Sequence, residues 1–230
     1  SKGESIADLL RALNALEGDF WVRLLYTHPA HWSDELIQTI AECDKVVKYV
    51  DIPLQHISDP MLANMRRETD RAHIENLLSR MRRGIPGLAI RTAFIVGFPG
   101  ETQEDFDQLL AFIESSRFER MGVFQYSREE GTNAYRLDSQ VHTMRRKSRW
   151  SRAMALQSRI NAEISAAQVG KTIRVIVDSP GKARSWMDAP EVDGVVHVDP
   201  ALAVGSFVDV VIQEARGYDL IATGAQVGSD

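Results

Sequence analysis

Hydrophobic positions alternate between helical and strand spacing over the first three-quarters of the chain. Ile6, Leu9, Leu10, Leu13 and Leu16 recur at helical spacing before Gly18. Further amphipathic stretches alternate with short apolar runs of strand length. The pattern predicts helices over 6–16, 33–43, 71–83, 102–114 and 143–167, and strands over 20–26, 46–54, 88–96 and 122–126.

Strands that alternate with helices at this spacing indicate βαβ units and a parallel sheet or barrel. Four such strands are too few to close an eight-stranded barrel. The chain also begins at Ser1 without an initiator methionine. We therefore expect an α/β fold with a partial TIM-like barrel that lacks its first strands.

The pattern changes after Gly170. Apolar residues alternate with polar ones over 171–177, 194–198 and 207–213, and turn residues such as Pro180 and Gly205 separate these runs. Short strands at this spacing predict a small antiparallel β-barrel. The sequence thus predicts two domains, residues 1–168 and residues 169–230.

Composition limits the class of protein. Hydrophobic residues make up 44% and charged residues 26%, as in ordinary globular proteins, and the net charge is −5. No apolar run has the length of a membrane span or of a signal peptide, so we expect a cytoplasmic protein. Cys43 is the single cysteine, which excludes an intrachain disulfide and any cluster that this chain ligates through several thiolates. We interpret Cys43 as a small buried apolar residue.

Polar side chains gather where the predicted strands end. In a parallel α/β barrel the active site lies at the carboxyl ends of the strands. The run IVGFPGE at 95–101 leads from a strand through two glycines into a helix, but it lacks the lysine and serine or threonine of a Walker loop. The polar or glycine residues at the strand ends are Arg23, Tyr26, His28, Gln55, His56, Arg91, Gly97, Gly100, Glu101, Gln125, Tyr126, Ser127 and Arg128.

Three of these strand-end motifs resemble, in order, those of the radical-SAM methylthiotransferases. They are DIPLQH at 51–56, IVGFPGE at 95–101 and FQYSREEGT at 124–132. The segment DPMLANMRR at 59–67 fits the same family, and residues 169–230 resemble its TRAM module, a small barrel associated with RNA or substrate recognition. Within the family, ARSWMDAPEVDG at 183–194 and the run 218–220 resemble the RimO-type branch, which modifies an aspartate of a ribosomal protein.

The resemblance implies S-adenosylmethionine and two four-iron four-sulfur clusters as cofactors. One cluster would be held by a Cys-x3-Cys-x2-Cys loop and the other by a separate N-terminal domain, and these cysteines are absent from this sequence. The resemblance also implies that residues 95–101 cradle the adenosine end and that residues 125–127 close the pocket. The residues that we expect to bind the cofactor are Arg23, Tyr26, Gln55, His56, Arg91, Gly97, Phe98, Gln125, Tyr126 and Ser127.

The implied reaction is radical insertion of a methylthio group at the β-carbon of an aspartate in ribosomal protein S-twelve of the small subunit. The expected partners are that protein and, through the TRAM-like module, RNA, with no membrane. Without the cluster cysteines, the chain by itself is expected to be inactive. Three alternatives stay open: a tRNA adenosine methylthiotransferase, a recognition fragment without catalysis, and a non-radical barrel enzyme that uses His28, His56 and Glu101.

Three further features bear on the partner. The basic run RRKSRWSR at 145–152 is interpreted as a solvated helix face, with nucleic-acid binding as the alternative. Trp186 is expected either to contact a partner or to pack on the small barrel. Acidic residues outnumber basic ones in the tail, which favours a basic ribosomal protein over a phosphate backbone as the partner.

Overall fold

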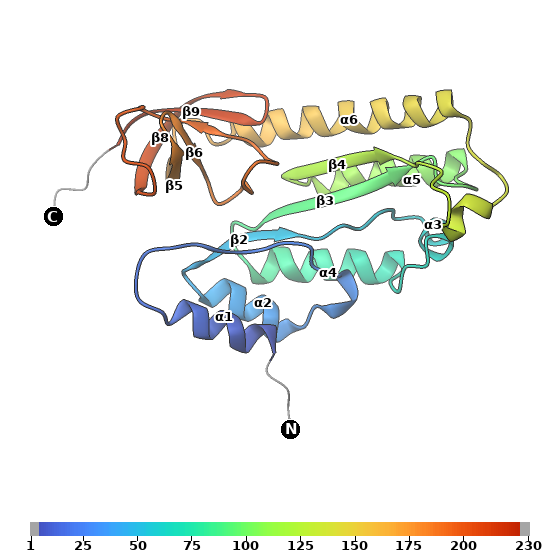
Figure 1. Cartoon of the computed structure of the whole chain (residues 1–230), viewed down its shortest axis with the longest axis horizontal. Coiled ribbons are helices and arrows are strands. Elements are labelled where there is room, and N and C mark those ends of the chain that lie inside the picture. The colour runs from blue at the N-terminus through green and yellow to red at the C-terminus, as the bar shows by residue number, and fades with distance from the viewer. Residues whose placement is uncertain (1–4, 226–230) are drawn as a thin grey trace.

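The chain forms a helix-flanked parallel sheet and a small closed barrel, joined by one long helix (Figure 1). The computed structural model describes residues 5–225. The elements of the first part are α1 (Ile6–Asn14), β1 (Val22–Leu24), η1 (Pro29–His31), α2 (Asp34–Glu42), β2 (Val46–Asp51), α3 (Asp59–Asn64), α4 (Arg71–Gly84), β3 (Ala89–Val96), α5 (Gln103–Ser116), β4 (Arg120–Gln125), η2 (Asn133–Arg136) and α6 (Thr143–Ala166). The barrel consists of β5 (Thr172–Ser179), β6 (Lys182–Arg184), β7 (Val196–His197), β8 (Phe207–Arg216) and β9 (Asp219–Ala225).

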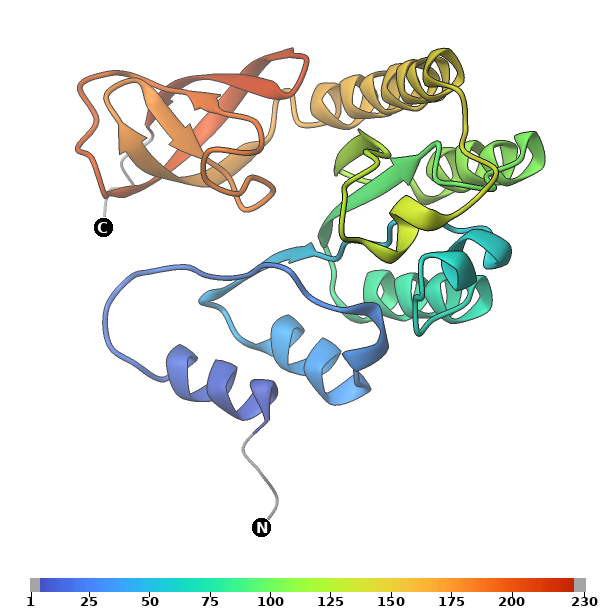
Figure 2. The same ribbon diagram turned by 45° about the vertical axis from the view of Figure 1, so that its right-hand side comes forward.

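The sheet has the strand order β1-β2-β3-β4, and all neighbouring strands run parallel. Side chains alternate between its two faces. Val46 and Val50 join the core under the helices, whereas Val47 and Tyr49 on the opposite face pack with the barrel. Figures 1 and 2 show the helices lying along the strands, and buried residues of α2, α4, α5 and α6 all join one core with Val46 and Val50, so these helices cover the same face of the sheet. The expected partial α/β barrel is confirmed.

Polar caps fix where the helices begin. Ser33 accepts a hydrogen bond from the backbone N–H of Leu36, and α2 starts one residue later, as the sequence predicts. Thr102 and Asp105 form a capping box at the start of α5, in which each side chain accepts from the other residue's backbone N–H. This cap determines the direction in which the chain leaves the glycine-rich turn after β3.

Replacing Asp105 with asparagine is expected to lower the free energy of unfolding at neutral pH by about 1–2 kcal/mol. Burial alone would raise the pKa of Asp105, but hydrogen bonds from Ser58 and Thr102 outweigh it and hold the pKa below its ordinary value. The carboxylate therefore stabilises the fold at pH values above its unfolded pKa, and this contribution is lost as the pH falls through the lower folded pKa.

Urea unfolding of both proteins over a series of pH values measures the Asp105 effect. The difference between wild type and the asparagine variant should be largest near neutrality and should shrink in acid. A difference that does not change with pH would show that the carboxylate charge contributes nothing.

The small barrel has the strand order β5-β6-β7-β9-β8 and is closed. Its pairs are antiparallel except for β7 and β9, which run parallel. The sequence predicts only three of the five strands. It misses β6 because three residues give no alternation, and it misses β9 because DLIATGA contains small residues that carry little strand signal.

The barrel packs against the amino ends of the sheet strands. Val47, Tyr49 and Ala89, near the starts of β2 and β3, share a core with the barrel residues Ile173 and Met187. In Figure 1 the barrel accordingly lies at the opposite end of the sheet from α3 and the loops that follow the strands. The barrel's loop 189–192 nevertheless reaches the ends of β1 and β2, where it lines a small pocket with Leu25, Tyr26 and Asp51.

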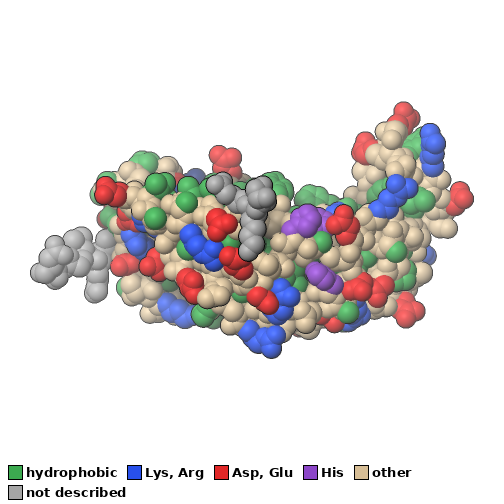
Figure 3. Space-filling model, turned by 90° about the horizontal axis from the view of Figure 1, so that it is seen from below, with side chains coloured by type: hydrophobic (Ala, Val, Ile, Leu, Met, Phe, Trp, Pro, Cys, Tyr) green, Lys and Arg blue, Asp and Glu red, His purple; other side chains and the backbone are tan. Residues whose placement is uncertain are grey.

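Exposed charges of both signs are interspersed on the face formed by α1, α2 and α4 (Figure 3). Arg11 pairs with Glu35 across α1 and α2, and Arg80 pairs with Asp34 across α4 and α2. This face therefore has no continuous basic field that would attract a polyanion. Within residues 5–225, no helix combines the length and apolar character needed to cross a bilayer.

Candidate functional site

The structure brings the chain segments after β2, β3 and β4 together at the carboxyl edge of the sheet. The backbone N–H of Gln55 donates to the carbonyl oxygen of Ala93 at 2.8 Å, and the N–H of Ile95 donates to the carbonyl of Gln55 at 2.8 Å. The N–H of Tyr126 donates to the carbonyl of Val96 at 2.9 Å. Gln55 has a φ of 71°, so the chain turns sharply here and places its side chain at the edge.

Gly97 begins the turn between β3 and α5, and only glycine fits there. Its φ is 74°, in the left-handed region. A Cβ at this position would overlap with Cγ of Arg146 on α6. The N–H of Gly97 donates to Oε2 of Glu101, and the N–H of Gly100 donates to the carbonyl of Ser139 at 2.9 Å. We call residues 97–102 the pocket loop.

A cavity of about 340 Å³ lies beside the pocket loop. Ile95 and Phe98 form its apolar wall, and the ring of Phe98 meets the ring of Tyr126 edge to face at a centroid distance of 5.2 Å. Nε of Arg67, in the cavity lining, is buried and has no hydrogen-bond partner among residues 5–225. The buried hydroxyl of Tyr126 likewise lacks a partner in the described part of the chain. Buried polar atoms without partners are rare in native proteins, so Nε of Arg67 is a donor that a bound molecule could satisfy.

Beneath the pocket loop lies a fully buried polar cluster in which Arg149 and Glu101 form an ion pair and His56 contacts Glu101. The N–H of Ser58 donates to Nδ1 of His56 at 3.0 Å, so Nδ1 carries no hydrogen and Nε2 donates to Oε1 of Glu101 at 3.3 Å. Nη1 of Arg149 donates to Oε2 of Glu101 at 2.8 Å. All three side chains are 2% exposed or less. The pair His56 and Glu101 is therefore out of reach of a substrate, which argues against the non-radical acid–base enzyme.

Two of the expected cofactor residues, Arg23 and Arg91, lie on the inner face of the sheet and contact the barrel. Arg23 donates to the carbonyls of Trp186 at 2.7 Å and Ser185 at 3.3 Å, and burial lowers its pKa to about 10. Arg91 contacts Asp51 at 3.1 Å and Asp193 at 3.4 Å. These arginines hold the barrel rather than line the pocket beside Gly97.

The junction between sheet and barrel contains charged residues that sequence reasoning missed. Nε of Arg120 donates to Oδ1 of Asp188 at 3.0 Å, and both side chains are 3% exposed or less. Burial raises the pKa of Asp188, although Arg120 and Ser185 oppose this shift. The Tyr49 hydroxyl donates to Asp193 at 2.8 Å, and burial and Asp193 raise the pKa of Tyr49. Two features of the sequence hint at this pairing. Segment 188–193 contains three acidic residues, and Arg120 lies just before the predicted strand 122–126.

The remaining expected residues are exposed at the carboxyl edge. The side chain of Tyr26 is 82% exposed, and its backbone N–H donates to Asp51 at 3.3 Å. Gln125 is exposed, and the hydroxyl of Ser127 donates to Glu129 at 2.6 Å. Of the expected set, Phe98 lines the cavity, and Gln55, Gly97, Gln125, Tyr126 and Ser127 lie on the neighbouring segments at the carboxyl edge.

Two open questions from the sequence are answered by contacts. Trp186 is an anchor at the junction, because its Nε1 donates to the carbonyl of Gly87 at 3.1 Å. The basic run on α6 is not a uniformly solvated face, because Arg149 is buried and Nε1 of Trp150 donates to the carbonyl of Val123 at 2.8 Å. Cys43 is buried, as predicted.

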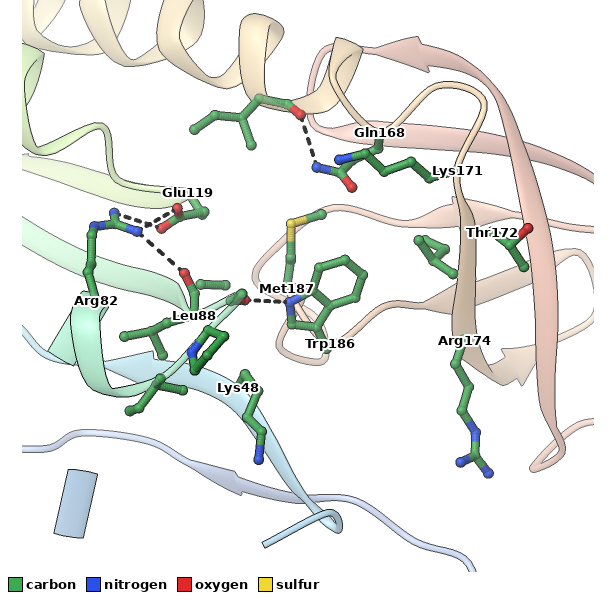
Figure 4. Close-up of a pocket in the computed structure, with 16 residues that line it drawn as sticks. Lys48, Arg82, Leu88, Glu119, Gln168, Lys171, Thr172, Arg174, Trp186 and Met187 are labelled. Carbon is green, nitrogen blue, oxygen red and sulfur yellow. Dashed lines mark hydrogen bonds and ion pairs between the residues drawn. The ribbon is translucent and has the colours of Figure 1, made fainter. Parts of the chain in front are cut away.

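A separate cleft of about 730 Å³ lies between the amino end of the sheet and the barrel (Figure 4). Trp186 and Met187 enter it from the barrel, and Arg82 points toward Glu119, which it contacts at 2.9 Å. Lys48 donates to the carbonyl of Cys43 at 2.9 Å. The cleft belongs to the junction and is remote from the strand carboxyl ends, where a parallel α/β sheet places its chemistry.

Comparison with known proteins agrees with this architecture. Residues 3–113 match the radical SAM superfamily model, and residues 169–224 match the TRAM domain model. The chain is 57% identical over 221 residues to the ribosomal protein uS12 methylthiotransferase RimO of Opitutus terrae and 56% identical over 222 residues to that of Akkermansia muciniphila. The chain belongs to the radical-SAM methylthiotransferase family.

Both methylthiotransferase relatives are longer than this chain. The matches cover 96% of the chain but 47% and 49% of the relatives, so the chain spans about half the length of the curated relatives it matches. Among solved structures, the coproporphyrinogen III oxidase HemN of Escherichia coli, a radical SAM enzyme, superposes with a TM-score of 0.54 at 18% identity. That superposition covers 67% of this chain and 36% of the oxidase. This likeness establishes the fold of the sheet region.

Proposed function

We propose that the protein containing this chain is a methylthiotransferase that adds a methylthio group to the β-carbon of an aspartate in ribosomal protein uS12. The identity of 57% and 56% to two relatives with that name, over 96% of the chain, carries the proposal. A carbon of this kind is unactivated, so the reaction needs the radical chemistry of the superfamily that residues 3–113 match.

The cavity beside the pocket loop fits the nucleoside end of S-adenosylmethionine. Its volume of about 340 Å³ and its apolar wall of Ile95 and Phe98 suit a flat base. A ligand acceptor would satisfy the buried Nε of Arg67, whose pKa is lowered by burial. Bound to a reduced four-iron four-sulfur cluster, S-adenosylmethionine supplies the radical that removes a hydrogen atom from the substrate carbon.

The residues in and around the cavity wall then have roles that agree with their positions. Gly97 lets the chain turn beside the stem of Arg146 and so places Phe98 in the cavity wall, and Phe98 with Tyr126 excludes water from one side. Gln55, Gln125 and Ser127 offer polar atoms at the rim. His56 acts indirectly, because it contacts Glu101 and is fully buried.

The cluster ligands lie outside this sequence. Cys43 is the single cysteine, and it is buried in the core under the helices with 5% exposure. We propose that the full-length protein holds two four-iron four-sulfur clusters, one beside the pocket and one in a further domain. The chain alone should therefore contain almost no iron or acid-labile sulfide after reconstitution and should be inactive.

Residues 169–230 are proposed as the domain that recognises the substrate, with residues 1–168 as the cofactor domain. The acidic residues of the tail split into two groups. Asp188 and Asp193 are used in the junction, whereas Glu191, Asp199 and Asp209 are exposed. The exposed carboxylates suit contact with a basic ribosomal protein, and they repel the phosphates of RNA.

The test uses the full-length protein, reconstituted anaerobically with iron and sulfide. It is supplied with S-adenosylmethionine, a reductant and either uS12 or unmodified tRNA, and a reaction without reductant is the control. Mass spectrometry should find one methylthio group on an aspartate of uS12. Modification of tRNA adenosine alone would overturn the substrate, and failure to cleave S-adenosylmethionine would overturn the reaction.

A further inference from the structure

We propose that Arg149, assisted by Arg146 one turn earlier, is a positioning residue that holds the pocket loop from helix α6 and so sets the affinity for the nucleoside ligand. The inference rests on the proposed function, because the ligand is taken to be S-adenosylmethionine. Neither arginine lines the cavity beside the loop. Both contact residues next to the lining residue Phe98 or packed against it: Glu101 and Thr102 for Arg149, and Gly97 and Tyr126 for Arg146.

Arg149 spans the end of the pocket loop. Nη1 donates to the carbonyl of Glu101 at 3.0 Å as well as to its carboxylate, and Nη2 donates to the carbonyl of Thr102 at 2.9 Å. The planar guanidinium offers donors in a fixed geometry, so it defines the position of all three acceptors at once. Arg149 is also among the largest side chains that are fully buried in residues 5–225.

Glu101 links Arg149 to the start of the pocket loop. Its Oε2 accepts from both Arg149 and the N–H of Gly97, and its Oε1 accepts from His56. One carboxylate therefore connects α6, the residue after β3 and the segment after β2. Removing Arg149 would leave this buried charge without its cationic partner.

Arg146 contacts the other end of the pocket loop, at Gly97. Its aliphatic stem packs where a Cβ of residue 97 would lie, and its Nη1 donates to the carbonyl of Tyr126 at 2.5 Å. Trp150 adds the contact to the carbonyl of Val123. Helix α6 thus contacts both the loop after β3 and the end of β4.

The polar character of this contact indicates positioning rather than simple packing. Farther along the same helix face, Ala153 and Ile160 are fully buried in the core under the helices. A buried ion pair stabilises a fold no better than apolar residues of similar volume, because both charges must be desolvated. What the arginine adds is directional hydrogen bonding to atoms of the loop.

The experiment measures equilibrium binding of S-adenosylhomocysteine and S-adenosylmethionine to the reconstituted full-length protein by calorimetry. Arg149→Met removes every donor, whereas Arg149→Lys keeps one charge without the fork. Arg159→Met is the matched control, because Arg159 lies on α6 but pairs with exposed Glu114 and Glu163. All measurements are made at a temperature at which circular dichroism shows each variant to be folded.

We expect Arg149→Met to raise the Kd of both ligands by at least about tenfold, Arg149→Lys to recover part of this loss, and Arg159→Met to match the wild type. Hydrogen exchange without ligand should show faster exchange at residues 97–102 in Arg149→Met and unchanged exchange in the barrel. If Arg149→Met does not fold, Glu101→Gln, which weakens the same contacts and removes the buried charge, is measured in its place.

Two results would overturn the inference. One is wild-type affinity in folded Arg149→Met or Glu101→Gln, and the other is unchanged exchange at residues 97–102. Failure of the proposed function gives a different pattern, since the wild-type protein itself would then bind neither ligand while the exchange difference at the loop persisted.

Discussion

Replacing Asp188 with alanine is expected to lower the free energy of unfolding by about 3–5 kcal/mol, one of the two largest effects we predict. The substitution leaves Arg120, whose side chain is 3% exposed, as a buried charge without its carboxylate partner. It also removes the acceptor for the hydroxyl of Ser185 at 2.6 Å. Both losses fall on the junction that attaches the barrel to the sheet.

Urea unfolding followed by circular dichroism measures the Asp188 effect on the chain. Glu214→Ala is the control, because Glu214 pairs with Arg216 on the surface and its removal should leave the unfolding midpoint unchanged. The double variant Arg120→Met with Asp188→Leu should recover most of the stability, since it removes both charges. A double variant as unstable as the single one would show that charge pairing is not the cause.

Replacing Gly97 with alanine is expected to cost about 2–5 kcal/mol and to abolish tight ligand binding. The left-handed backbone at φ 74° contributes about 1–2 kcal/mol of this cost for any residue with a Cβ. Overlap with the stem of Arg146 adds about 1–3 kcal/mol, because the arginine must leave its contact with Tyr126.

Gly87→Ala separates the two contributions. Gly87 has the same φ of 74°, but a Cβ there would meet no atom within 4 Å among the described residues. Chemical unfolding should show the backbone cost alone for Gly87→Ala and a larger loss for Gly97→Ala. Equal losses of unfolding free energy in the two variants would mean that Arg146 moves away from the new Cβ at no energetic cost.

The sequence predicts the sheet well because β2, β3 and β4 are buried on the helix side and the helices carry polar caps. Ser33 and Thr102, for example, mark helix starts within one residue. The predicted start of β4, residue 122, is two residues late. Arg120 is charged and would not be expected in a buried strand, but its charge is paired with Asp188. Long-range pairing of this kind has no local signal.

The pocket was predictable in its segments but not in the direction of each side chain. The glycines of residues 95–101 signal a turn that allows close approach, and the turn lies where the motif places it. Arg23 and Arg91 lie on the inner face of their strands, where they contact the loop 185–193, and the local sequence does not reveal that contact. Arg149 was hidden in a basic run, although it falls on the same helix face as Ala153 and Ile160.

Helix α6 also sets a distance. Its 24 residues, at a rise of about 1.5 Å each, measure about 36 Å from the pocket to the barrel. One inserted residue would push the barrel outward by about 1.5 Å and rotate it by about 100°, which the fixed contacts of Asp188 and Asp193 could not follow. The number of turns in α6 therefore fixes the distance between the pocket and the barrel. In the proposed function, this is the distance between the reacting carbon and the domain that recognises the substrate.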